Sequence, residues 1–141
     1  MLIVSGCLAD LQCRYDGAAK PCEMVIRMVA EGKAIPVCPE QLGGLPTPRM
    51  PAERRGNRII RKDGKDVTEE FQRGAREALK LAKLTGASTA ILKARSPSCG
   101  SGQIYDGSFT GNLISGNGVF AELCKNNGME VKSEEELEGK R

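Results

Sequence analysis

The chain begins MLIVSGC (residues 1–7), a run of apolar and partly β-branched residues that stops at Ser5-Gly6-Cys7. Such a run predicts a short strand buried on both faces, as strands of parallel sheets are. Further along the chain, similar short runs recur and amphipathic segments separate them. Strands are expected at 34–38 (AIPVC), 90–93 (AILK) and 129–132, and helices between Pro21 and Gly32, from Asp66 or Thr68 to about Thr85, and over 119–126.

This alternation of strands and helices predicts an α/β fold, a single domain with a small, mostly parallel sheet and crossover helices. The domain is expected over 1–132, with 133–141 (SEEELEGKR) as a charged, frayed C-terminal tail. We expect no regular element in the Pro- and Gly-rich stretch 39–51, a hairpin over 58–67 that turns at Asp63-Gly64, and a long loop over 95–118. Ligands of parallel sheets bind beyond the carboxyl ends of the strands, so the site is expected there.

The composition excludes several kinds of chemistry. The sequence has no histidine, which removes the commonest general base and every Ser-His or Cys-His device. No apolar run approaches the roughly 20 residues that a membrane helix needs, and no signal peptide is recognisable. We therefore expect a cytoplasmic protein without a membrane partner, in which the six cysteines are thiols available for metal binding or catalysis.

Three of the cysteines, Cys7, Cys38 and Cys99, lie just beyond the carboxyl ends of expected strands, in polar loops. Neighbouring parallel strands would bring them to one edge of the sheet, which favours a clustered metal site over three isolated buried thiols. Soft thiolates suit an iron–sulfur cluster, zinc or copper(I). Cys13 is left open as a further ligand, a neighbouring thiol or a resolving cysteine. The helical segments that hold Cys22 and Cys124 favour structural roles for both.

Three sequence blocks resemble the signature blocks of the thiouracil desulfidase family, a microbial family formerly known only as a domain of unknown function. They are SGCLADLQCRYDG (5–17), PVCPEQLGGLPTPR (36–49) and KARSPSCGSGQIYDG (93–107). The resemblance extends from Val4 to about Gly128. One departure is Asp10, which stands where the family usually has glycine.

The resemblance implies an enzyme that removes sulfur, as sulfide, from a thiocarbonyl of a small heterocycle such as 2-thiouracil. It implies a [4Fe-4S] cluster on Cys7, Cys38 and Cys99, whose open iron acts as a Lewis acid toward the substrate sulfur. Glu40 would be the catalytic carboxylate, and Ser96 the assisting hydroxyl. Two alternatives remain: a non-catalytic iron–sulfur or redox-sensing protein, and a sulfur-handling module that acts on thiolated RNA.

The residues that follow Cys13 are candidates for holding the substrate. Arg14 and Tyr15 offer hydrogen bonding and stacking to a planar heterocycle, whereas an Arg14–Asp16 pair would only fix the loop. Arg49 is expected to face an anionic group or solvent. The basic stretch 49–65 is the only support for RNA binding, and its lack of interleaved aromatic residues favours a solvated surface instead. Nucleic acid is therefore not expected as a partner.

Overall fold

A computed structural model describes residues 1–138 of the chain. Its centre is a sheet of four strands that are all parallel, in the order β2-β1-β5-β8. The strands are β1 (Leu2–Ser5), β2 (Ala34–Val37), β5 (Thr89–Leu92) and β8 (Glu130–Ser133). The expected α/β class and mostly parallel sheet are confirmed, and each expected strand is present within one residue at either end.

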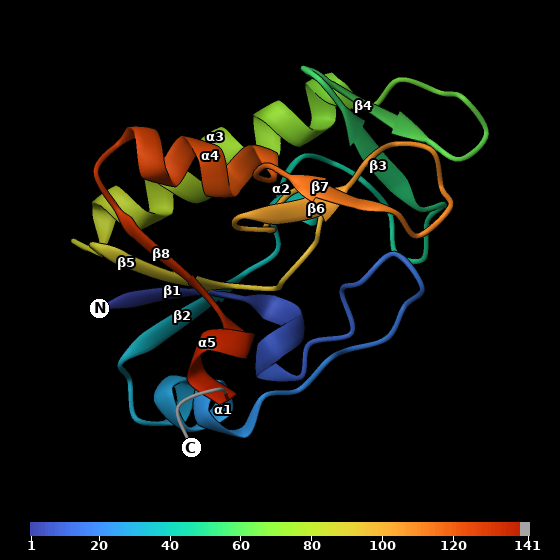
Figure 1. Cartoon of the computed structure of the whole chain (residues 1–141). Coiled ribbons are helices and arrows are strands. Elements are labelled where there is room, and N and C mark those ends of the chain that lie inside the picture. The colour runs from blue at the N-terminus through green and yellow to red at the C-terminus, as the bar shows by residue number, and fades with distance from the viewer. Residues whose placement is uncertain (139–141) are drawn as a thin grey trace.

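Helices cover both faces of this sheet (Figure 1). On one face lie α3 (Thr68–Leu84) and α4 (Val119–Asn126), and on the other lie α1 (Glu23–Ala30) and the C-terminal α5 (Glu134–Glu138). Because side chains alternate along a strand, Ile3 and Leu92 pack toward α3 and α4, whereas Val4 and Ile91 pack toward α1. Among residues 1–138, no helix is both long and apolar enough to span a membrane.

The long helix α3 shows how the sequence sets an element. Asp66 accepts a hydrogen bond from the backbone N–H of Thr68 at 2.8 Å, which satisfies a donor at the start of the helix. Phe71, Ala75, Ala78, Leu79 and Ala82 form its buried face, as the 3.6-residue period requires. The helix ends at Leu84, just before Gly86, whose φ of +70° suits glycine. Its expected extent is thus confirmed to within about one residue.

Several short elements were not expected from the sequence. The stretch 39–51 contains α2 (Pro39–Leu42), because proline is tolerated in the first turn of a helix. An unexpected hairpin joins β3 (Ala52–Arg55) to β4 (Arg58–Arg61) and turns at Gly56-Asn57. The expected hairpin that turns at Asp63-Gly64 follows it and is confirmed by the antiparallel bridge between Ile60 and Asp66. The expected loop 95–118 contains an antiparallel pair, β6 (Gln103–Tyr105) and β7 (Leu113–Ser115), whose mostly exposed side chains leave little apolar signal in the sequence.

The expected frayed tail is also wrong for the residues that the structure describes. Ser133 ends β8, and α5 follows at once. Glu134 is only 7% exposed because its carboxylate has partners inside the protein, the Lys93 ammonium and the backbone N–H of Ala94. Residues 139–141 of the expected tail lie outside the described residues.

Candidate active site

Cys38, Cys7 and Cys99 follow three strands that are neighbours in the sheet, β2, β1 and β5. Cys7 lies in a short 3-10 helix, η1 (Gly6–Ala9), directly after β1, and Cys38 is the residue before α2. Cys99 follows β5 after a short loop. All three line one cavity of about 570 Å³ at the carboxyl ends of the strands. The topology therefore brings together three thiols that are remote in sequence.

Burial and neighbouring charges set the ionisation of these thiols. Burial raises the pKa of Cys7 to about 11 and raises that of Cys99 well above its usual value. Each of these two pKa values is also raised by the charge of Cys38, and that of Cys99 by the charge of Cys7 as well. A hydrogen bond with Cys13 lowers the pKa of Cys38 to about 7.

The donor set fits an iron–sulfur cluster better than a single ion. Within residues 1–138, no group of three Cys, Asp or Glu side chains meets closely enough to hold one metal ion. A four-iron cluster is larger, and its thiolate ligands bind separate corners of the cube. Three thiols that line one cavity without meeting at a point suit that geometry, and soft sulfur is the ligand that iron–sulfur clusters take.

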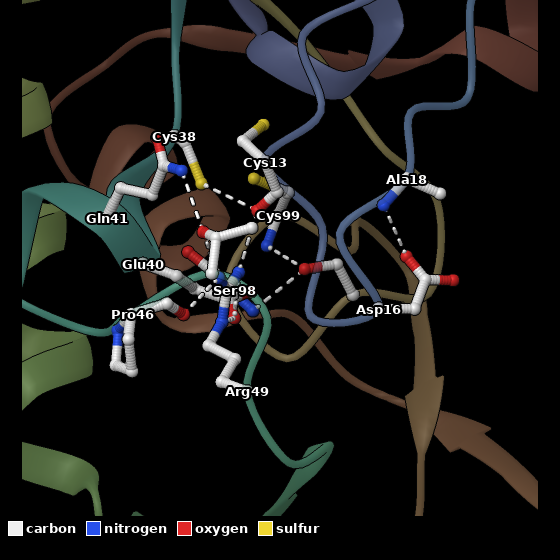
Figure 2. A network of polar contacts seen from close by, with 12 residues as sticks. Cys13, Asp16, Ala18, Cys38, Glu40, Gln41, Pro46, Arg49, Ser98 and Cys99 are labelled. Carbon is white, nitrogen blue, oxygen red and sulfur yellow. Dashed lines mark hydrogen bonds and ion pairs between the residues drawn. The ribbon is translucent and has the colours of Figure 1, made fainter.

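The other cysteines divide between the cavity and the core. Cys13 lines the cavity, and its backbone oxygen lies 3.7 Å from the sulfur of Cys38 (Figure 2). Cys22 is buried just before the first turn of α1 and also lines the cavity. The structural role expected from its helical segment did not include this position. Cys124 is fully buried on the inner face of α4, where burial raises its pKa to about 12. Cys124 is therefore a structural thiol, as its helical position indicates.

Glu40 lies in the first turn of α2, two residues after Cys38, and also lines the cavity. Its Oε1 accepts a hydrogen bond from Nε of Arg49 at 3.1 Å and lies 3.0 Å from Nη2 of Arg49 in an ion pair. Burial raises the pKa of Glu40 above its usual value, and the charge and hydrogen bonds of Arg49 oppose that rise. Arg49 faces neither solvent nor an open anion site: its side chain is only 7% exposed.

The guanidinium of Arg49 joins three segments of the chain around Glu40 (Figure 2). Nη1 donates to the carbonyl of Pro46 at 3.0 Å and to Oγ1 of Thr47 at 3.1 Å. Nη2 donates to the carbonyl of Cys13 at 3.0 Å and lies 3.0 Å from Oε1 of Glu40 in an ion pair. Four hydrogen bonds and this ion pair thus hold the guanidinium, a fork geometry that lysine cannot reproduce. The sequence expectation for Arg49 missed this role.

Ser96 and Ser98 differ in their surroundings. Oγ of Ser96 lines the cavity side of the loop and accepts hydrogen bonds from the backbone N–H groups of Ser98 and Cys99, at 3.1 and 3.0 Å. Its two lone pairs are therefore occupied, and its own O–H remains available as a donor. Ser98 is 1% exposed and is not among the residues that line the cavity. Within the described chain its Oγ has no hydrogen-bond partner.

The loop that carries Cys13 places Arg14 and Tyr15 on the cavity and leaves Asp16 outside its lining. The guanidinium of Arg14 lies 5.5 Å from the centre of the Tyr15 ring and 3.7 Å from the Asp16 carboxylate. Asp16 also accepts a hydrogen bond from the N–H of Ala18, so it shapes the loop. Asp10 is exposed and away from the cavity; its φ of 72° is the left-handed conformation that glycine adopts most easily.

Lys93 and Glu134 are among the charged residues of the cavity wall that sequence reasoning missed. Lys93 follows the last residue of β5, and Glu134 opens α5; their side chains form an ion pair of 2.8 Å. The position of Lys93 directly after a buried strand is the sequence feature that could have identified it as a site residue. The basic hairpin, in contrast, is largely satisfied within the protein: Arg54 pairs with Glu122, and Arg55 donates to the carbonyl of Gly107.

Comparison with known proteins places these features in context. The family model described as 2-thiouracil desulfurase matches residues 2–136. An uncharacterized protein of Bacillus subtilis (strain 168), YbbK, is 46% identical, with 97% of each chain aligned. A solved structure of a [4Fe-4S]-dependent thiouracil desulfidase, TudS, superimposes with a TM-score of 0.93 at 46% identity, covering 98% of this chain and 93% of that one.

Proposed function

Because the chain belongs to the 2-thiouracil desulfurase family, we propose that it is an enzyme that removes sulfur from a small thiolated heterocycle such as 2-thiouracil. The observation that carries the proposal is the convergence of Cys7, Cys38 and Cys99 on one cavity, beside Glu40 and Ser96. The similarity to a [4Fe-4S]-dependent thiouracil desulfidase supports the same reading. The expected cytoplasmic location stays a prediction.

In this proposal Cys7, Cys38 and Cys99 hold a [4Fe-4S] cluster, and Cys13 is a neighbouring thiol. When bound, such a cluster supplies an iron without a protein ligand, which is a Lewis acid toward a thione sulfur. The charge of Lys93 lowers the pKa of Cys7 and so favours its thiolate form against the effect of burial. The lowered pKa of Cys38 likewise favours a ligand that is already ionised.

The proposed reaction replaces sulfur by the oxygen of water. A thiocarbonyl C=S and one water molecule give a carbonyl C=O and hydrogen sulfide, so no electron donor or acceptor is required. Glu40 takes a proton from the attacking water and returns it toward the departing sulfur. Arg49 occupies only Oε1 of Glu40, which leaves Oε2 as the oxygen that exchanges protons. Arg49 is a positioning residue, because it acts through Glu40.

Ser96 acts as a hydrogen-bond donor in this scheme. Both lone pairs of its Oγ already accept backbone N–H groups, so the hydroxyl is poorly suited to act as a base or nucleophile. Its O–H is free to donate to a heteroatom of the substrate ring or to negative charge that develops during attack. The same hydrogen bonds tie Ser96 to the backbone of Cys99, which fixes the hydroxyl relative to a proposed ligand.

Anaerobic reconstitution of the purified protein tests the cofactor and the reaction together. Iron and sulfide counted per chain should approach four of each, and 2-thiouracil should then yield uracil and sulfide, about one of each per molecule consumed. Cys99→Ser should lose most of the iron, whereas Cys124→Ser is the matched control and should retain it. Full iron content in Cys99→Ser would refute the ligand assignment. A stable cluster that neither binds nor converts thiouracil would identify a binding-only protein.

Glu40→Gln tests the proton transfers separately from cluster binding. The amide has nearly the shape of the carboxylate but carries no exchangeable charge, so the cluster should remain while sulfide release falls by about 10²–10⁴-fold. Glu122→Gln is the control, because Glu122 also pairs with an arginine but lies outside the cavity lining. Equal single-turnover rates for Glu40→Gln and the unaltered protein, at equal cluster loading, would remove Glu40 from the mechanism.

A further inference from the structure

The ion pair between Lys93 and Glu134 is largely enclosed by the protein at the carboxyl ends of the strands. Nζ of Lys93 lies 2.8 Å from Oε2 of Glu134, and the two side chains are 19% and 9% exposed. The other carboxylate oxygen of Glu134 accepts the backbone N–H of Ala94 at 2.8 Å. The backbone N–H of Lys93 donates to Oγ of Ser5 at 2.8 Å. Both charged groups are thus held in place by neighbours.

Both members of the pair line the cavity that also contains Cys7. Val4 of β1 lies opposite Ile91 of β5 in the register of the sheet. Together with the hydrogen bond from Lys93 to Ser5, this register places Lys93 beside the segment that leads to Cys7. Arg14 is another cation of the cavity wall, but its guanidinium lies beside Tyr15 and Asp16. Charges in a partly dry site act more strongly than charges in water.

We propose that the Lys93–Glu134 pair sets the electrostatic potential where Cys7 would hold the cluster. Lys93 offsets part of the negative charge of the thiolates, and Glu134 limits that effect by offsetting part of the charge of Lys93. The inference rests on the proposed function, because it requires a cluster on Cys7. A cluster with three thiolate ligands carries net negative charge, so a fixed ammonium beside it stabilises both the bound cluster and any added negative charge. Glu134 holds the ammonium in place and offsets part of its charge.

In this arrangement the C-terminal helix α5 contributes a charged residue, Glu134, to the site. Glu134 is its first residue and the only carboxylate that contacts Lys93 among residues 1–138. The neighbouring Glu135 pairs with Arg95 at 2.8 Å, so a second ion pair fastens α5 to the segment after β5. The end of the chain therefore supplies a charge to the site that the three cysteine-containing blocks do not contain.

The test compares Lys93→Met with Glu134→Gln after anaerobic reconstitution, with the cluster titrated by spectroelectrochemistry. At the midpoint potential of the unaltered protein, the ratio of reduced to oxidised cluster should fall roughly 3- to 10-fold in Lys93→Met and rise by a similar factor in Glu134→Gln. Lys93→Arg keeps the charge and should stay near the unaltered ratio. The double variant Lys93→Met, Glu134→Gln should lie between the two single variants.

Opposite signs are the decisive feature, because a merely structural pair would perturb the cluster in the same direction whichever partner is changed. Shifts of the same sign, or no shift in either variant, would overturn the inference while leaving the desulfidase proposal intact. An unaltered protein that takes up no cluster would refute the proposed function and this inference with it. If Lys93→Met loses its cluster, the comparison of Glu134→Gln with Lys93→Arg decides the question. The ratio of reduced to oxidised cluster should then change in Glu134→Gln and stay unchanged in Lys93→Arg.

Discussion

Replacing Gly74 with alanine tests how the site is held against the long helix. Gly74 lies on the buried face of α3, where α2 crosses it. Helix α2 begins directly after Cys38 and carries Glu40. A Cβ atom at Gly74 would lie 1.7 Å from the carbonyl oxygen of Pro39, the first residue of α2. A side chain at the facing Gly43 would clash in the same way, because its Cβ would lie 2.0 Å from the carbonyl oxygen of Glu70.

Two effects oppose each other at this position, and their magnitudes decide whether Gly74→Ala raises or lowers the free energy of unfolding. Alanine is the better helix former, by about 1 kcal/mol in a helix interior. Ordinary contact begins near 3.4 Å, so the two backbones would have to separate by about 1.7 Å. Neither side of the contact is a rotatable side chain, and overpacking of this kind costs about 1–3 kcal/mol or more. We expect the steric cost to exceed the propensity gain, with Gly74→Ala about 2 kcal/mol less stable to unfolding.

Urea denaturation of the apoprotein measures the free energy of unfolding, and single-turnover sulfide release measures the effect on the site. Displacing α2 shifts Glu40 and Cys38 together, and an error of about 1 Å in a catalytic group typically costs about 10²-fold in rate. Gln72→Ala is the matched control, an exposed position on the same helix that should change stability by less than about 0.5 kcal/mol. A Gly74→Ala protein that is about 1 kcal/mol more stable would refute the packing argument.

Three further predictions concern single contacts. Arg49→Lys keeps the charge but not the five-donor fork, so the kcat for sulfide release should fall about 10- to 100-fold with little change in KM; an unchanged kcat would contradict a positioning role. Ser96→Ala should lower sulfide release at equal cluster loading while Ser96→Thr, which keeps the hydroxyl, restores much of it; equal rates in all three proteins would exclude the donor role. Hydrogen bonds from Thr68 and Arg58 lower the pKa of Asp66 to about 2, so its contribution to stability is present above the unfolded-state pKa and is lost as the pH falls toward 2. Asp66→Asn should therefore reduce the fall in urea midpoint between about pH 6 and about pH 2.5, and an unchanged pH profile would show that Asp66 contributes nothing to it.

Local patterns in the sequence were sufficient for the main frame of the fold. The four apolar runs and the amphipathic segments between them predict the parallel strands and the helices α1, α3 and α4, because burial and periodicity are properties of neighbouring residues. The short β6–β7 pair and α2 escaped this reasoning. Exposed strands carry no apolar alternation, and a single helical turn is too short to show a period.

The position of the candidate site also follows from the sequence. Cysteines that follow parallel strands of one sheet are brought to the same end of the sheet, and in the observed order β2-β1-β5 Cys38, Cys7 and Cys99 line one cavity there. That inference needs no knowledge of side-chain contacts. It rests on the direction of the strands and on crossover connections of one hand.

The pairing of charges around the site was decided by the tertiary structure alone. Arg49 lies in a Pro-rich stretch that looks like a surface loop, yet its guanidinium finds Glu40 and the carbonyl of Cys13, which is 36 residues away. Lys93 meets Glu134 only because β5 and β8 are neighbours and α5 folds back onto the site. Such partners are distant in the chain, and an ion pair leaves no periodic signal in either segment. Which charges are buried together therefore depends on how the segments pack.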